Sequence, residues 1–284
     1  MNAGCVDCFL KQTDKLLLKH NVPEHYTKDI ILRFTRFIEK HRDEDISSPE
    51  CACFLHRMIK KAVRTQDLYK QEKEYYNNLL LSHEKDIRKS IYASDDPFQS
   101  ALRYAVAGNI IDFGPPGSFD VHETLSAALS KEPAVNHTEQ LRVALQKASK
   151  VLYLADNAGE IVMDKIFIDI INHPGLFFAV RGGNVINDVT LEDARYVGVN
   201  KIARVISNGY DAPSTLLNRC SPGFVSIFND ADIIISKGQG NLEGLIQNTG
   251  KRIFFLLMVK CEVIAELTGV NKGDVVILDN RYLL

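Results

Sequence analysis

The second half of this chain consists of short apolar runs that alternate with helical segments, and this pattern restricts the fold more than any other feature. The apolar runs are rich in β-forming residues and occupy residues 151–155, 176–180, 201–206, 233–236, 253–257 and 274–278. Segments with helical character lie between several of them, at residues 160–171, 191–198 and 214–220. Strands that alternate with helices form parallel sheets that are covered on both faces. The sequence therefore predicts an α/β fold with a mainly parallel, doubly wound sheet.

The first half of the chain predicts helices only. Apolar side chains recur every three or four residues from Tyr26 to Ile38, which is the spacing of an amphipathic helix. A longer stretch with a charged face, residues 66–89, is typical of a second helix. The polar break at residues 131–137 then separates this region from the apolar runs. We therefore expect an all-helical domain at residues 1–137 and an α/β domain at residues 138–284.

Composition excludes several classes of partner. The 284 residues include 34 basic and 36 acidic side chains, for a net charge of −2, so the chain has no general positive field to attract nucleic acid. The apolar run at residues 253–259 is far shorter than the roughly 20 residues that cross a bilayer. The N-terminus does not resemble a signal peptide. We therefore expect a cytoplasmic protein that binds neither nucleic acid nor membranes.

Polar side chains follow three of the predicted strands. Asp156 and Asn157 come directly after the first strand, and Arg181 and then Asp188 follow the second. Lys237 follows the strand at 233–236. In open α/β sheets, ligands bind in the crevice beyond the carboxyl ends of the strands. We therefore expect these side chains to converge on one ligand.

The residue types in this group indicate the kind of ligand. Carboxylate and amide oxygens are the ligands that Mg²⁺ and Mn²⁺ prefer, so we interpret Asp156, Asn157 and Asp188 as ligands of a divalent cation. Lys237 and Arg181 would add positive charge toward a phosphate. The neighbouring glycines let backbone N–H groups approach an anion closely. The pattern predicts a metal site that holds a phosphorylated substrate.

Each motif has a simpler interpretation when it stands alone. An Asp-Asn pair after a strand is often a turn or the N-cap of a helix. Lys237 fits an ordinary surface lysine, and Arg181 fits a partner in a salt bridge. The repetition of polar and glycine residues at three strand ends favours a ligand site over three unrelated turns.

Together these motifs resemble the signatures of the damage-control phosphatase family, formerly domain of unknown function 89, which includes proteins once called acidic-residue methyltransferases. The resemblance rests on five motifs in order along the chain: Cys5-Val-Asp-Cys8, Ala107-Gly-Asn109-Ile-Ile-Asp112, Asp156-Asn-Ala-Gly-Glu160, Arg181-Gly-Gly183 with Asn187-Asp188, and Lys237-Gly-Gln-Gly-Asn241. The first two motifs resemble those of the prokaryotic subgroup. The likeness therefore covers nearly the whole chain.

The resemblance implies a metal-dependent phosphatase that hydrolyses phosphomonoesters of small metabolites, such as sugar phosphates and damaged phosphometabolites. The implied cofactor is one divalent metal ion, Mn²⁺, Mg²⁺, Ni²⁺ or Co²⁺. The implied metal ligands are Asp156, Asn157 and Asp188, and the implied catalytic residues are Asp156, Asp188 and Lys237. The residues implied in substrate binding are Asn109, Glu160, Arg181, Lys237, Gly240 and Asn241. The physiological substrate stays open, as does whether an aspartate attacks phosphorus or only orients a water.

The cysteines and the oligomeric state are not assigned by these motifs. Cys5 and Cys8 have the spacing of metal ligands or of a redox pair, and Cys51 and Cys53 could lie beside them. A structural metal site, buried thiols and redox chemistry all remain open for the four cysteines.

Two other functions remain compatible with the sequence. A strand that ends in Asp156-Asn-Ala-Gly159 faintly resembles the first motif of S-adenosylmethionine-dependent methyltransferases, although that motif normally contains more glycine. A carboxyl methyltransferase is therefore one alternative. A non-catalytic protein that binds phosphometabolites at the same anion site is the other.

Overall fold

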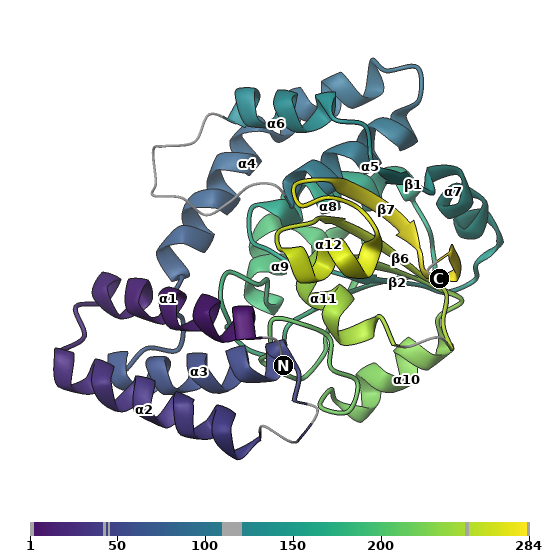
Figure 1. The fold of residues 1–284 in the computed structure, drawn as a ribbon. Coiled ribbons are helices and arrows are strands. Elements are labelled where there is room, and N and C mark those ends of the chain that lie inside the picture. Colours follow the sequence, from purple (N-terminus) through teal and green to yellow (C-terminus); the bar gives the residue numbers. More distant parts are fainter. Residues whose placement is uncertain (1–2, 42–43, 45, 110–120, 248–249, 283–284) are drawn as a thin grey trace.

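A seven-stranded sheet lies at the centre of the computed structural model, which describes residues 3–41, 44, 46–109, 121–247 and 250–282 (Figure 1). The strand order is β1-β7-β6-β5-β2-β3-β4, and all neighbours are parallel except β6 and β7. The strands are Val135–Asn136 (β1), Val151–Leu154 (β2), Leu176–Val180 (β3), Arg204–Ser207 (β4), Ile233–Lys237 (β5), Ile253–Met258 (β6) and Val275–Asp279 (β7). The predicted mainly parallel sheet is confirmed.

The direction in which the chain winds through the sheet changes beside β2. Tyr153 of β2 pairs with Phe178 of β3 on one side and with Ile235 of β5 on the other. From β2 the chain winds outward through β3 and β4, then returns to the opposite side of β2 to form β5 and β6. The connections that follow β2 and β5 therefore diverge, and the crevice between such connections is where ligands bind in doubly wound sheets.

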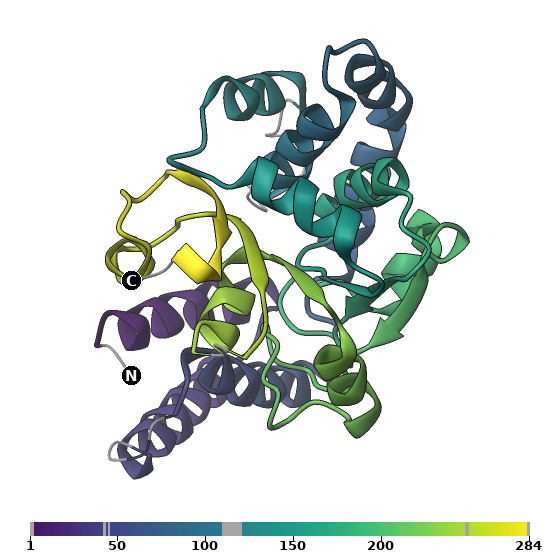
Figure 2. The same cartoon turned by 90° about the vertical axis from the view of Figure 1, so that its right-hand side faces the viewer.

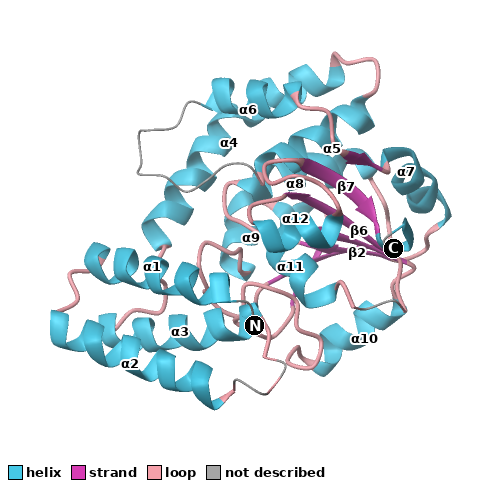
Figure 3. Cartoon of the chain, in the orientation of Figure 1, coloured by secondary structure: helices cyan, strands magenta, loops and turns pink. Residues whose placement is uncertain are grey.

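Helices cover both faces of the sheet, as predicted (Figure 3). Alternate residues of each strand point to opposite faces, so Tyr153 and Ile235 join one buried cluster while Leu152 and Ile234 join another. The first cluster includes side chains from α7 (Thr138–Lys147), α8 (Glu160–Ile171) and α9 (Leu191–Val197). The second includes side chains from α10 (Pro222–Asp230), α11 (Gly238–Leu245) and α12 (Glu262–Thr268).

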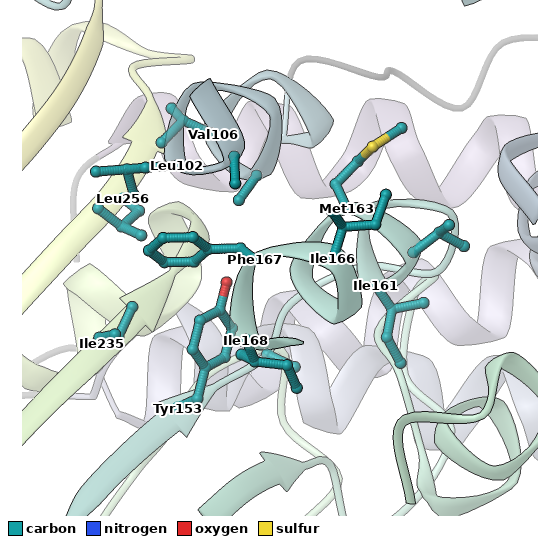
Figure 4. Close-up of a cluster of buried hydrophobic side chains, with 14 of the residues drawn as sticks. Leu102, Val106, Tyr153, Ile161, Met163, Ile166, Phe167, Ile168, Ile235 and Leu256 are labelled. Carbon is teal, nitrogen blue, oxygen red and sulfur yellow. The ribbon is translucent and has the colours of Figure 1, made fainter. Parts of the chain in front are cut away.

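Three of the N-terminal helices belong to the same core as the sheet. They are α4 (Lys70–Tyr92), α5 (Pro97–Gly108) and α6 (Val121–Ser130). Figure 4 shows Leu102 and Val106 of α5 beside Phe167 of α8. This helical layer therefore rests on α8 and is not an independent core.

The first three helices form a hydrophobic core of their own. These helices are α1 (Ala3–Lys19), α2 (Glu24–Lys40) and α3 (Ser48–Val63), and both views of the molecule show them grouped at one end, away from α6 (Figures 1 and 2). Leu17, Phe34 and Leu55 are at most 2% exposed within this cluster. Polar contacts to Asp211, which follows β4, join the group to the α/β part through Arg57 and Lys60.

Three predicted elements differ from the observed ones. Residues 214–220 are turns and irregular chain, because the helix signals lie just beyond them: Ser221 caps α10 by accepting a hydrogen bond from the Phe224 amide, and Pro222 starts that helix. The strand predicted at residues 201–206 starts later than expected. Residues 199–201 form a short 3₁₀ helix, and β4 begins at Arg204. The helix predicted at residues 66–89 begins at Lys70 and ends at Tyr92.

The sheet also extends slightly into the predicted helical region. Val135 and Asn136 pair with Val276 and Ile277 at the edge of the sheet, just before the boundary predicted at residue 138. The division into two domains stays a prediction. Among the described residues, no helix combines the length and the apolar character that crossing a membrane requires.

Because α1, α2 and α3 have a separate core, we expect these three helices to unfold while the sheet stays folded. Phe34→Ala should cost about 3–5 kcal/mol, because it opens a cavity in a fully buried cluster. Hydrogen exchange should become faster in these three helices and stay slow in β2 and β5. Leu32→Ala, at a position that is 47% exposed, is the matched control. An equal loss of protection in β2 and β5 would show that the two cores unfold together.

Candidate active site

The loops that follow β2 and β3 are held side by side by their backbones. The Val189 amide donates to the carbonyl of Asp156 at 2.9 Å, and the Arg181 amide donates to the carbonyl of Val189 at 2.9 Å. Asn157 and Asp188 form an antiparallel bridge. These contacts bring the three predicted metal ligands, Asp156, Asn157 and Asp188, into one group at the carboxyl ends of the strands.

Arg181 contacts the carboxylates of both Asp156 and Asp188. Its Nε donates to Asp188 Oδ2 at 2.6 Å, and its Nη2 lies 3.5 Å from Asp156 Oδ1. Its Nη1 donates to Asn241 Oδ1 at 2.8 Å. Arg181 is 3% exposed, and the rigid fork of its guanidinium fixes the orientation of both carboxylates. Arg181 is therefore both a salt-bridge partner and a neighbour of the predicted metal ligands, so the two interpretations of this residue do not exclude each other.

Asn109 brings the helical layer into the site from the end of α5. Its Nδ2 donates to Asp156 Oδ2 and to Glu160 Oε2, each at 3.1 Å, and its Oδ1 accepts from the Met258 amide at 3.3 Å. The structure therefore places Asn109 and Glu160 beside the predicted metal ligands. The remainder of the predicted motif, residues 110–112, lies outside the described residues.

Lys237 is fully buried and contacts Glu160, next to the predicted metal ligands. Its Nζ lies 2.5 Å from Glu160 Oε1 and 2.5 Å from Asp164 Oδ1, and it donates to the carbonyl of Ala105 at 2.8 Å. These three acceptors match the three hydrogens of an ammonium group. The interpretation as a surface lysine is wrong, and contact with phosphate stays a prediction.

Asp164 was not singled out from the sequence, although a signal for it exists. It is the only charged residue in the apolar segment 161–164 of α8, and it follows Glu160 by one helical turn. It is fully buried, and it accepts from the hydroxyl of Tyr153 at 2.7 Å as well as from Lys237. A carboxylate in an apolar helix needs a buried partner, and Lys237 is that partner.

The two glycines after Lys237 differ in what they contact. A β-carbon on Gly238 would lie 1.9 Å from Asp156 Oδ2, so only glycine lets this loop pass the carboxylate. A β-carbon on Gly240 would instead lie 2.1 Å from the carbonyl of Pro213, on a neighbouring loop. Asn241 donates to the carbonyls of Ala155 and Lys237. Gly240 thus packs against a loop, and Asn241 connects the ends of β2 and β5.

The buried charges of the site do not balance. The described residues of the group contribute four carboxylates and two cations, which leaves a formal excess of two negative charges: Asp156, Glu160, Asp164 and Asp188 against Arg181 and Lys237. Burial raises the pKa of Asp156 to about 8, with further contributions from Asp188 and Glu160. Burial likewise raises the pKa of Asp188, although Arg181 opposes the rise.

This excess of charge and the chemistry of the oxygen donors fit a divalent cation. Asp156, Asn157 and Asp188 are the residues that could hold it, since two carboxylates and an amide suit a hard metal ion. Across the described residues, no three His, Cys, Asp or Glu side chains are grouped so as to hold a metal ion. A cation here would therefore depend on the mixed set of carboxylate and amide oxygens.

The four cysteines singled out in the sequence lie in α1 and α3. Cys5 and Cys8 are in the first turns of α1, and all six cysteines of the chain are free. Cys51 and Cys53 are buried in α3, and burial raises the pKa of each thiol to about 11. Thiols with such pKa values stay protonated and unreactive near neutral pH.

The burial of Asp164 predicts how stability depends on pH. Burial raises its pKa from 3.8 to about 7, although Lys237 opposes the rise. The folded protein therefore binds more protons than the unfolded chain between about pH 4 and pH 7, and Asp164 lowers stability as the pH rises through this window. Asp164→Asn removes the titrating charge and keeps an acceptor for Tyr153.

In urea unfolding, Asp164→Asn should therefore gain stability relative to wild type between pH 5 and pH 8. Asp169→Asn, a more exposed carboxylate of the same helix that pairs with Arg88, is the matched control. A difference between Asp164→Asn and wild type that is the same at both pH values would contradict the prediction.

Comparisons with known proteins confirm the family that the motifs predicted. The family model for the damage-control phosphatase ARMT1-like domain matches residues 1–276. A damage-control phosphatase of Archaeoglobus fulgidus is 33% identical over 229 residues, which cover 78% of this chain and 79% of that protein. A damage-control phosphatase of Pyrococcus horikoshii is 36% identical over 191 residues, covering 66% and 67%.

The fold is also that of a solved relative. A crystal structure of a protein from Pyrococcus horikoshii, assigned to the family of domain of unknown function 89, matches with a TM-score of 0.91 at 26% identity. The match covers 99% of both chains. The family model extends over nearly the whole sequence, and the fold agrees over the same length. The chain therefore belongs to the damage-control phosphatase family, as a protein with the ARMT1-like domain.

Proposed function

We propose that this protein is a metal-dependent phosphatase that hydrolyses phosphomonoesters of small metabolites, including sugar phosphates and damaged phosphometabolites. The observation that carries the proposal is the group of buried carboxylates from the loops after β2 and β3 and from α8, whose formal excess of two negative charges calls for a divalent cation. The names of two relatives, both damage-control phosphatases, support the same reaction.

The proposed cofactor is Mn²⁺, Mg²⁺, Ni²⁺ or Co²⁺, held by Asp156, Asn157 and Asp188. When bound, such an ion polarises a phosphoryl oxygen and neutralises negative charge on it. Arg181 keeps both aspartates in place, because it contacts Asp188 at 2.6 Å and Asp156 at 3.5 Å. Asn109 orients the other oxygen of Asp156. The chain itself thus fixes the directions of the ligands before any substrate arrives.

The proposed substrate is small, because the site is enclosed by several elements. Asn109 and Glu160 are each 1% exposed, and Asn241 is fully buried. Lys237 would reach a phosphate only by exchanging one of its three present acceptors. We propose that Lys237 mainly neutralises Glu160 and Asp164, and that the N–H groups of the glycine loops also contact the phosphate.

Phosphate release from p-nitrophenyl phosphate and from a panel of sugar phosphates, each with the four metal ions in turn, tests the proposal. Activity that EDTA removes and a metal ion restores is expected. Binding of the sugar phosphates without turnover would instead support a non-catalytic binding protein. Methyl transfer from S-adenosylmethionine without phosphate release would support the methyltransferase alternative.

Asp156→Ala and Asp188→Ala should each lower kcat/KM by more than the 10- to 100-fold that loss of an outer partner of a metal ligand typically costs. Each change removes a proposed ligand but little apolar surface, so the folded state should persist, as circular dichroism can verify. Asp169→Ala, which removes a carboxylate outside the site, should leave turnover unchanged. Wild-type turnover in either site variant at saturating Mn²⁺ would rule out the proposed site.

A further inference from the structure

Two buried polar side chains of α4, Lys73 and Asn77, face the candidate site and belong to none of its motifs. They lie one helical turn apart on the same face of the helix. Lys73 is 4% exposed and Asn77 is 2% exposed. A lysine is almost never buried unless it is paired, so the partners of these two residues show what the pair holds in place.

Lys73 holds the loop after β3. Its Nζ donates to Asn184 Oδ1 at 3.2 Å, and Asn184 lies in the segment between Arg181 and Asp188. The same Nζ lies 2.7 Å from Asp193 Oδ2. Asp193 in turn closes the capping box of α9 by accepting from the Thr190 amide at 2.8 Å. Lys73 therefore fixes this loop on both sides of Asp188.

Asn77 holds the loop after β2. Its Oδ1 accepts from the Gly159 amide at 2.7 Å, two residues beyond Asn157. Its Nδ2 donates to Asp193 Oδ1 at 3.4 Å, which connects this contact to that of Lys73. Gly159 has a φ of +75°, and a β-carbon there would lie 3.0 Å from the β-carbon of Tyr76. The loop thus passes directly over α4.

We propose that Lys73 and Asn77 are positioning residues that hold the two ligand-bearing loops in register, so that α4 sets the spacing of Asp156, Asn157 and Asp188. Both loops are irregular chain, and partners of this kind orient metal ligands in other sites. Asp193 joins the two contacts into one network that spans both loops. The positioning of the loops stands by itself, and its consequence for metal binding rests on the proposed function.

Hydrogen exchange in the metal-free protein tests the positioning directly. Asn77→Leu should speed exchange of the Gly159 amide, since it removes the acceptor of that amide. Lys73→Met should speed exchange across residues 183–190, and Lys73→Arg should restore slow exchange. Lys70→Met, one turn earlier on the same helix with a side chain that is 68% exposed, is the matched control and should change neither loop.

Mn²⁺ titration calorimetry tests the consequence for the metal. Lys73→Met and Asn77→Leu should each weaken Mn²⁺ binding by about 10- to 100-fold, while Lys73→Arg and Lys70→Met should bind as wild type does. Asn77→Leu leaves every charge in place and keeps the test valid if Lys73→Met does not fold. A lower melting temperature with unchanged loop exchange and unchanged Mn²⁺ affinity would overturn the proposal.

The two measurements separate this inference from the function on which it rests. A wild-type protein that binds none of Mn²⁺, Mg²⁺, Ni²⁺ and Co²⁺ would refute the metal-dependent phosphatase, and the exchange of the two loops would still decide the positioning. Tight binding by wild type and by both variants, together with unchanged exchange of the two loops, would refute the positioning alone.

Discussion

The pairing of buried carboxylates with buried cations at the carboxyl ends of β2 and β5 is the interaction on which the rest of the structure depends. Lys237 compensates Glu160 and Asp164, and Arg181 holds Asp156 together with Asp188. Each of these charges would be costly to bury alone. Because partners come from β5, α8 and the loops after β2 and β3, these elements must assemble together for any charge to be compensated.

The remaining excess of negative charge connects this stability problem to function. A site that was optimised for folding alone would balance its charges, whereas this group leaves two negative charges for a ligand to offset. Burial raises the pKa of Asp156 to about 8, and the nearby carboxylates of Asp188 and Glu160 add to the rise. Strained or uncompensated groups of this kind concentrate at functional sites. The helical layer then completes the site. Asn109 donates a hydrogen bond to Asp156, Lys73 contacts the loop after β3, and Asn77 contacts the loop after β2.

The metal ligands that were predicted from sequence share one property: each lies in a loop that follows a strand. Asp156, Asn157 and Asp188 could be found because parallel strands bring their carboxyl ends to the same edge of a sheet. Asp164, Lys73 and Asn77 were missed, since each lies inside a helix and acts through partners that are distant along the chain. The helix predicted at residues 214–220 was wrong because the capping residue and the proline that start a helix lie just beyond it, at Ser221 and Pro222.

The sequence by itself determined the parallel sheet, the order of its strands along the chain and the family, because periodicity and short motifs are local properties. Only the tertiary structure decided that Lys237 is buried between two carboxylates, and that α4 and α5 contact the loops of the site. It also decided that α1, α2 and α3 have a separate core, while α4, α5 and α6 share that of the sheet. The physical reason is that a charge's burial and partners depend on residues far away in the chain, which no local pattern records.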